Sequence, residues 1–171
     1  MRTISALLMT TAVLFSDATT TAADQRSDAG ESPQEMALKN RKAVPKDSDF
    51  DHAVSLQALL DKQDRNAWSN TRAAILRGVV VQTEKEQDGD IHIVLAPSGK
   101  ETDTRQWVIA EVPVAAQKRD ATLRFDVIQA LKGKQVNVSG WLYYEPDTEQ
   151  DDPRGTLWEL HPATAVTLAR E

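Results

Sequence analysis

The chain has 171 residues, a length that suits one globular domain and is marginal for two. Its formal net charge is −6, and it contains no cysteine. The absence of cysteine excludes disulfides, thiolate nucleophiles and thiolate metal sites. The acidic balance argues against nucleic acid as a partner, because binding to a phosphate backbone depends on lysine and arginine.

The N-terminus has the pattern of an export signal. Arg2 supplies a positive start, residues 4–15 form a mostly apolar run, and the small residues that end at Ala23 are typical of a signal-peptidase site. We therefore predict a signal peptide over residues 1–23, cleavage after Ala23, and a secreted or periplasmic protein without a membrane span after cleavage. The alternative is that the apolar run is retained as a membrane anchor, although it is short for one.

Two segments are expected to precede the main domain. Residues 24–49 are polar, contain two prolines and lack apolar periodicity, so we predict a disordered tether there. Residues 50–72 form an N-terminal helical extension. Its short helix is predicted over residues 55–63, because Ser55 is a suitable N-cap and the leucines that follow it recur at helical spacing.

Residues 73–171 are predicted to form a mainly β domain. We expect strands over residues 75–83, 90–96, 106–114, 134–144 and 156–168, and a helix over residues 120–131. Gly78, inside the first strand, predicts a bulge or bend. The order β-β-β-α-β-β is that of the OB-fold, a small five-stranded Greek-key barrel, here preceded by the short helix. The alternative is an ordinary five-stranded sheet with helices on one face.

Charged and histidine side chains interrupt three of these strands. Asp90 and His92 share one face of the second strand, because residues two apart in a strand point the same way. Glu159 and His161 do so in the last strand, and Glu111 interrupts the third. If these side chains converge, His92, Glu159 and His161 are candidate ligands of a divalent metal such as zinc, with Glu111 or Asp90 as the catalytic base. The alternative is a structural hydrogen bond between Glu159 and His161, with no cofactor.

Aromatic residues also lie in the predicted strands. Trp107, Trp141 and Tyr143 are candidate ligand-binding residues, because exposed aromatic rings on an OB-fold sheet stack on bases or sugars. The alternative is that these rings fill the barrel and its ends, which is the usual place for tryptophan in a small β domain.

The order of several motifs resembles a family of uncharacterised, often exported bacterial proteins with an OB-fold-like chain. The motifs are DGDIHIVL, WVIAEVP, GKQVNVSGWLYYE and WELHPATAV, and the resemblance covers about residues 50–168. Relatives share a D-x-H strand and a terminal W-E-[IL]-H-P strand. The positions that match here are Asp90, His92, Glu111, Gly140, Trp158, Glu159, His161 and Pro162. The family carries no established function, so the resemblance implies common site positions and no particular activity.

Two departures from this resemblance bear on catalysis. Some relatives carry a cysteine before the D-x-H strand, where this chain has residues 84–89 without one. Relatives often have aspartate and histidine after the G-W-L strand, where this chain continues Glu145, Pro146, Asp147 and has no histidine. A site that used that histidine would be reduced here, which favours binding over catalysis.

Three functions follow as hypotheses. The first is an exported, monomeric binding module for an unknown ligand or envelope partner, without catalysis. The second is a metal-dependent hydrolase of the phosphodiesterase or nuclease type that uses the histidine and carboxylate cluster. The third is a structural envelope protein held by its tether. A fold alone does not decide between them.

The export signal makes a direct prediction. The protein purified from the periplasm or the medium should begin at Asp24, because cleavage is expected after Ala23. Intact-mass measurement of the exported protein checks this. A chain that keeps residues 1–23 and sediments with membranes would contradict it and support the retained anchor.

Overall fold

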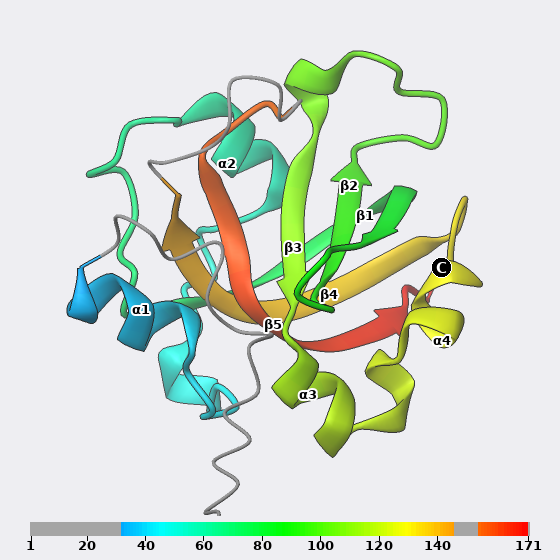
Figure 1. Ribbon diagram of the computed structural model, residues 1–171. Helices are drawn as coiled ribbons and strands as arrows, with labels where there is room; N and C mark the ends of the chain where they lie inside the picture. Colours follow the sequence, from blue (N-terminus) through cyan, green and yellow to red (C-terminus); the bar gives the residue numbers. More distant parts are fainter. Residues whose placement is uncertain (1–31, 146–153, 171) are drawn as a thin grey trace, which may run out of the picture.

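Five strands pair into a closed barrel in the order β1-β2-β3-β5-β4 (Figure 1), in a computed structural model that describes residues 32–145 and 154–170. The strands are β1 (Ala73–Lys85), β2 (Ile91–Ala96), β3 (Val108–Val112), β4 (Gln135–Tyr144) and β5 (Trp158–Leu168). The α-helices are α1 (Pro33–Lys39), α2 (Leu56–Asp61), α3 (Val114–Arg119) and α4 (Phe125–Gln129). The predicted signal peptide lies outside the described residues. None of the described helices is long and apolar enough to cross a membrane.

The barrel closes through one parallel contact. β1 pairs antiparallel with both β2 and β4, and β2 pairs antiparallel with β3. β3 then pairs parallel with β5, at Ala110 and Leu160, and β5 returns antiparallel to β4. Five strands in this order, with the helical segment between β3 and β4, make an OB-fold barrel. The prediction of the fold is confirmed, and the alternative of an ordinary sheet is excluded because the sheet closes on itself.

The core lies inside the barrel and is built by period-2 alternation in the strands. Alternate residues of each strand point inward and are almost fully buried, which removes apolar surface from water. The inward-facing residues on β2 and β3 are Ile91, Ile93, Leu95, Val108, Ala110 and Val112. The intervening side chains of the same strands therefore face the outer surface of the barrel.

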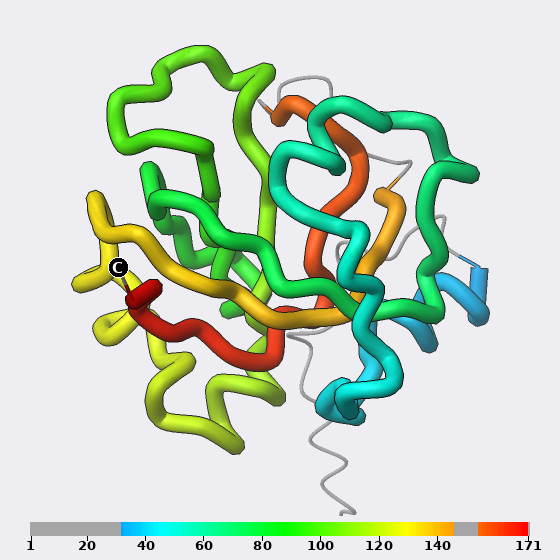
Figure 2. The backbone as a smooth tube through the Cα atoms, turned by 180° about the vertical axis from the view of Figure 1, so that it is seen from behind, coloured from blue at the N-terminus to red at the C-terminus, as the bar shows by residue number. Residues whose placement is uncertain are grey.

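Helices close the two ends of the barrel. α2 covers one end with Leu56, Leu59 and Leu60, and its N-cap is Ser55, as predicted, whose hydroxyl accepts the Ala58 N–H at 3.1 Å. α3 and α4 lie at the other end (Figures 1 and 2), where Ile128 joins the core.

The helical segment between β3 and β4 differs from the prediction. Instead of one helix over residues 120–131 there are α3, a 3₁₀ turn at Ala121–Leu123 and α4. The Asp120 side chain caps the 3₁₀ turn by accepting the Thr122 N–H at 2.8 Å. Arg124 is then extended, with ψ 150°, so the chain cannot continue as one helix.

The N-terminal arm, residues 32–50, packs on the barrel. It contains α1, which begins with a capping box between Ser32 and Glu35, and it differs there from the expected tether. The Arg41 guanidinium lies 4.2 Å from the centre of the Trp141 ring, and the indole N–H of Trp141 donates to the Ala43 carbonyl at 2.7 Å. These contacts join segments far apart in the sequence, which is why the composition of the arm did not reveal them.

Two glycines let segments of the barrel approach closely. A Cβ on Gly78 would lie 2.7 Å from Leu56 Cδ1, so the absence of a side chain at Gly78 makes room for α2. The bulge predicted at Gly78 lies instead between Val80 and Gln82, where the pairing of β1 with β2 shifts register. At Gly140 a Cβ would lie 2.7 Å from the Pro162 carbonyl oxygen. Gly140 also lies at a register shift between β4 and β5, where the two backbones touch.

Replacing Gly140 tests this close approach. Gly140→Ala should lower the free energy of unfolding by about 1–3 kcal/mol, because the new methyl group meets the backbone of β5 and the barrel must shift. Chemical denaturation measures the change. Gly99→Ala is the matched control, since its Cβ would meet only a side-chain methyl of Val79 at 3.3 Å. Equal stabilities of the two variants would contradict the packing described.

Candidate functional site

The interrupting polar residues lie on the outer surface of three adjacent strands. His92 on β2 is directly opposite Glu111 on β3, and β5 with Glu159 and His161 runs along the other side of β3. Their neighbours in sequence, such as Ile91 and Leu160, point into the core. The alternation predicted from the sequence therefore brings these side chains together on one face.

The side chains form what we call the carboxylate–histidine network, which consists of Glu86, His92, Glu111, Glu159 and His161. At its centre, one oxygen of Glu111 lies 3.0 Å from His92 Nε2 and 3.3 Å from His161 Nδ1. The His92 Nδ1 atom lies 3.3 Å from Glu86, and His161 Nδ1 lies 3.2 Å from Glu159. Acidic and imidazole groups thus alternate across three strands.

Arg154 extends this alternation at the far end. Its guanidinium donates to the second oxygen of Glu159 at 2.9 Å, and both side chains are almost fully buried. Glu159 is therefore held between one arginine and one histidine. This pair satisfies a carboxylate that would otherwise be costly to bury.

The ionisation of the network follows from these contacts. Burial by itself would lower the pKa of His92, but the hydrogen bond and charge of Glu111 outweigh burial and raise that pKa to about 9. Burial opposes protonation of His161 in the same way, and Glu111 and Glu159 outweigh it and raise its pKa. For Glu111, burial would raise the pKa, while the charges of the two histidines lower it to about 2. These shifts favour a charged Glu111 carboxylate and protonated histidines beside it.

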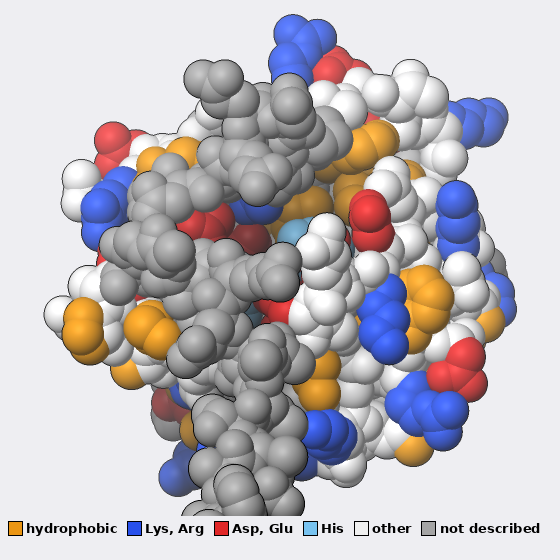
Figure 3. All heavy atoms as spheres, in the orientation of Figure 1, with side chains coloured by type: hydrophobic (Ala, Val, Ile, Leu, Met, Phe, Trp, Pro, Cys, Tyr) orange, Lys and Arg blue, Asp and Glu red, His pale blue; other side chains and the backbone are white. Residues whose placement is uncertain are grey.

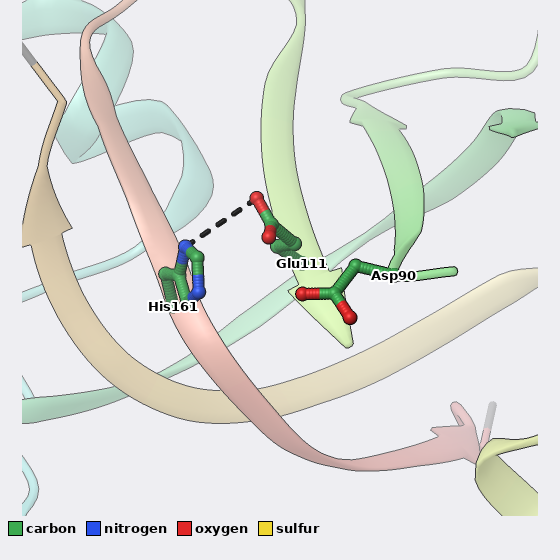
Figure 4. Close-up of side chains that lie close together, drawn as sticks. All are labelled: Asp90, Glu111 and His161. Atoms are coloured by element: carbon green, nitrogen blue, oxygen red, sulfur yellow. Dashed lines mark ion pairs between the residues drawn. The ribbon is translucent and has the colours of Figure 1, made fainter. Parts of the chain in front are cut away.

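Asp90 lies at the edge of the network, just before β2. Its carboxylate accepts the Val114 N–H at 2.7 Å, which fixes its orientation. Burial raises the pKa of Asp90 to about 7, and the nearby charge of Glu111 adds to the effect. Figure 4 shows the side chains of Asp90, Glu111 and His161 directed into the same space between their strands.

A metal could be held by part of this set. Ligand atoms of Asp90, Glu111 and His161 all lie within 4.8 Å of one another. Within residues 32–145 and 154–170, these three side chains form the one cluster of acidic and histidine residues close enough to share a metal ion. Of the metal ligands predicted from the sequence, His161 is in this group. His92 and Glu159 lie beside it and contact its members. Glu111 and Asp90, predicted as catalytic bases, are in the ligand group instead.

The aromatic candidates do not form an exposed stacking face. Only 8% of Trp141 and 1% of Tyr143 are accessible, so both are buried. Arg41 of the N-terminal arm covers Trp141. Lys39 lies 5.3 Å from the ring centre of Tyr143, and the edge of His161 contacts the same ring. Residues of the N-terminal arm and of β5 make these contacts. The strand pattern alone did not indicate that the arm and β5 lie beside Trp141 and Tyr143.

Trp107 lies away from the network. It is half-buried and lines a shallow groove together with Val80, Val81, Gly99, Lys132 and Gly133. The three aromatic candidates therefore do not meet at one surface. Trp107 also precedes β3, outside the strand in which it was predicted, so the predicted strands did not define a common site.

Sequence reasoning missed the loop residues of the site. Glu86 precedes the turn between β1 and β2, and Arg154 follows the acidic loop. Residues in turns and loops have no periodicity that assigns them to a face, so no pattern singled them out. Their one signal was charge next to a strand end.

The sequence matches no protein-family model and no curated protein. Among solved structures it is similar to a "putative aspartyl-tRNA synthetase" from Leishmania major Friedlin, at 16% sequence identity and a TM-score of 0.41. That match covers 77% of this chain and 23% of the other, so this chain spans about a quarter of that protein's length.

The raised pKa of His92 predicts how stability depends on pH. Its folded pKa of about 9 exceeds the unfolded value of 6.5, so its stabilising effect is complete below about pH 6.5 and is lost as pH rises through about 9. Between about pH 6.5 and pH 9, the free energy of unfolding of the wild type should fall, and that of His92→Asn should fall by less. The His92 ring should titrate near pH 9 by NMR.

Two variants make this measurement specific. In Glu111→Gln the titration of His92 should move back toward 6.5, because the charge that holds its proton is gone. His52→Asn, at an exposed histidine outside the network, should keep the wild-type pH dependence. A wild-type His92 that titrates near 6.5 would show that the contact with Glu111 is not formed in solution.

Proposed function

We propose that the protein is an exported binding module that holds its ligand on the outer face of β2, β3 and β5, without catalytic turnover. OB-fold barrels bind ligands on the face of their second and third strands and on the loops beside it. In this chain that face carries the carboxylate–histidine network. The loops beside it contribute Glu86 and Arg154. The position of the network on this face is the observation that carries the proposal.

The energetics of the network support a functional role. Removing several charges from water is costly, and a buried ion pair stabilises a fold little more than apolar residues of similar size. Strongly shifted ionisable groups that meet on one surface are also typical of functional sites.

The chemistry of the face indicates the kind of ligand. The side chain of Glu111 is 15% accessible and that of His92 is 25% accessible, so both are reached from the surface. Figure 3 shows a histidine side chain between acidic side chains on this face. Imidazolium N–H groups donate and carboxylates accept, so the face suits a small ligand that carries both a cationic and an anionic group. The carboxylates disfavour a phosphate backbone.

The protonation of His92 favours a role in binding over a role as general base. A general base must be unprotonated near the working pH. With a pKa of about 9, His92 keeps its proton and acts as a hydrogen-bond donor. Glu111, between two imidazolium groups, is likewise stabilised as a charged acceptor and is a weak base.

An NMR titration tests the proposal. The exported protein, labelled with ¹⁵N, is titrated with free amino acids, short peptides, polyamines and oligosaccharides. One class should shift the backbone signals around His92, Glu111 and His161, and Glu111→Gln should weaken that binding about tenfold or more. Glu101→Gln, in the groove that contains Trp107, is the control and should bind like the wild type.

Two results would contradict the proposal. One is that no compound of the panel shifts these signals. The other is binding that shifts only the groove around Trp107 and is unaffected by Glu111→Gln, which would place the ligand elsewhere on the barrel.

A further inference from the structure

We infer that Asp90, Glu111 and His161 form a binding site for one divalent cation of the zinc type, and that this ion is part of the ligand-binding face. The inference rests on the proposed function and names a ligand class for the same face. It concerns a bound ion and involves no catalytic step.

The positions of the three ligand atoms suit one ion. Around a tetrahedral zinc ion with bonds of about 2.0–2.2 Å, neighbouring ligand atoms are about 3.3–3.6 Å apart. His161 Nδ1 and the Glu111 oxygen are already 3.3 Å apart. The atoms of all three residues lie within 4.8 Å, so small side-chain rotations bring Asp90 to the same ion.

The barrel holds the three residues in place. Asp90 ends the turn before β2, Glu111 is on β3 and His161 is on β5, so each comes from a different part of the rigid barrel. One oxygen of Asp90 accepts the Val114 N–H, which leaves the other directed toward Glu111 and His161 (Figure 4). Such preorganisation lowers the cost of binding an ion.

The surrounding residues have the roles that neighbours of metal ligands usually have. His92 contacts Glu111 from the side of β2, and Glu86 supports His92 in turn. Glu159 contacts His161 and is itself held by Arg154. Hydrogen bonds of this kind orient the ligands of protein metal sites. His92 is therefore assigned as a positioning residue. Glu159 lies 3.2 Å from the same Nδ1 atom of His161 and gives up that contact when the ion binds.

The donor set selects the type of ion. One imidazole nitrogen with two carboxylates suits zinc and similar transition metals, whereas calcium and magnesium prefer oxygen ligands alone. When the ion binds, His161 Nδ1 gives up its proton to solvent, and the positive charge of the ion takes its place beside Glu111. Three protein ligands leave a further position on zinc for a group of the ligand.

Zinc binding to the exported protein tests the inference. The protein is treated with a chelator, and Zn²⁺ is titrated by calorimetry and by competition with a coloured chelator. We expect one ion per chain, with affinity about tenfold or more lower in His161→Asn and in Asp90→Asn. His52→Asn removes the exposed third histidine and should bind zinc like the wild type.

The variants keep the result interpretable. Circular dichroism shows whether each variant folds. Asp90→Asn changes one half-buried side chain at the edge of the network, so it still tests the site if His161→Asn does not fold. No binding by the folded wild type overturns the inference. The inference is also overturned if Asp90→Asn binds zinc as tightly as the wild type, or if His52→Asn abolishes binding. Either result indicates adventitious zinc. If zinc fails but a compound of the NMR panel shifts the signals around Glu111, the proposed function stands and only the ion is wrong.

Discussion

The parallel contact between β3 and β5 is the constraint on which the rest of the structure depends. It closes the barrel at Ala110 and Leu160, and the next residues of the two strands, Glu111 and His161, then lie side by side on the outer face. On the other side of β3, His92 of β2 lies directly opposite Glu111. Without closure the last strand would pair only with β4, and the carboxylate and the two imidazoles would not meet.

Glu111 is the electrostatic centre that this closure creates. Its charge keeps protons on two histidines, and their charges in turn keep it ionised, so each group is stabilised by the others. One face of the barrel therefore carries a set of paired charges in place of packed apolar side chains. Compared with apolar residues of similar size, such pairs add little to stability, because desolvation offsets part of their attraction. The barrel core carries most of the apolar burial, and the paired charges lie on its outer face.

The N-terminal arm completes the surface beside this centre. Arg41 lies over Trp141 and Lys39 over Tyr143, so two large aromatic rings of β4 are covered by cations from a segment nearly a hundred residues earlier. Cation–π contacts of this kind compensate for the polar composition of the arm, which has little apolar surface of its own to bury. The arm thus packs beside the face of β2, β3 and β5 that carries the network.

The sequence by itself determined the fold class and most of the strands, because period-2 alternation, turn residues and helix caps are local signals. It also indicated that Asp90 shares a face with His92 and that Glu159 shares a face with His161, since alternation assigns each side chain to one side of its strand. Only the tertiary structure decided which of them touch. It also decided that Trp141 and Tyr143 are buried, that the arm packs on β4, and that Glu86 and Arg154 join the site. The physical reason is that contacts across strands and loops depend on barrel closure and register, which bring together residues distant in sequence and which no local pattern records.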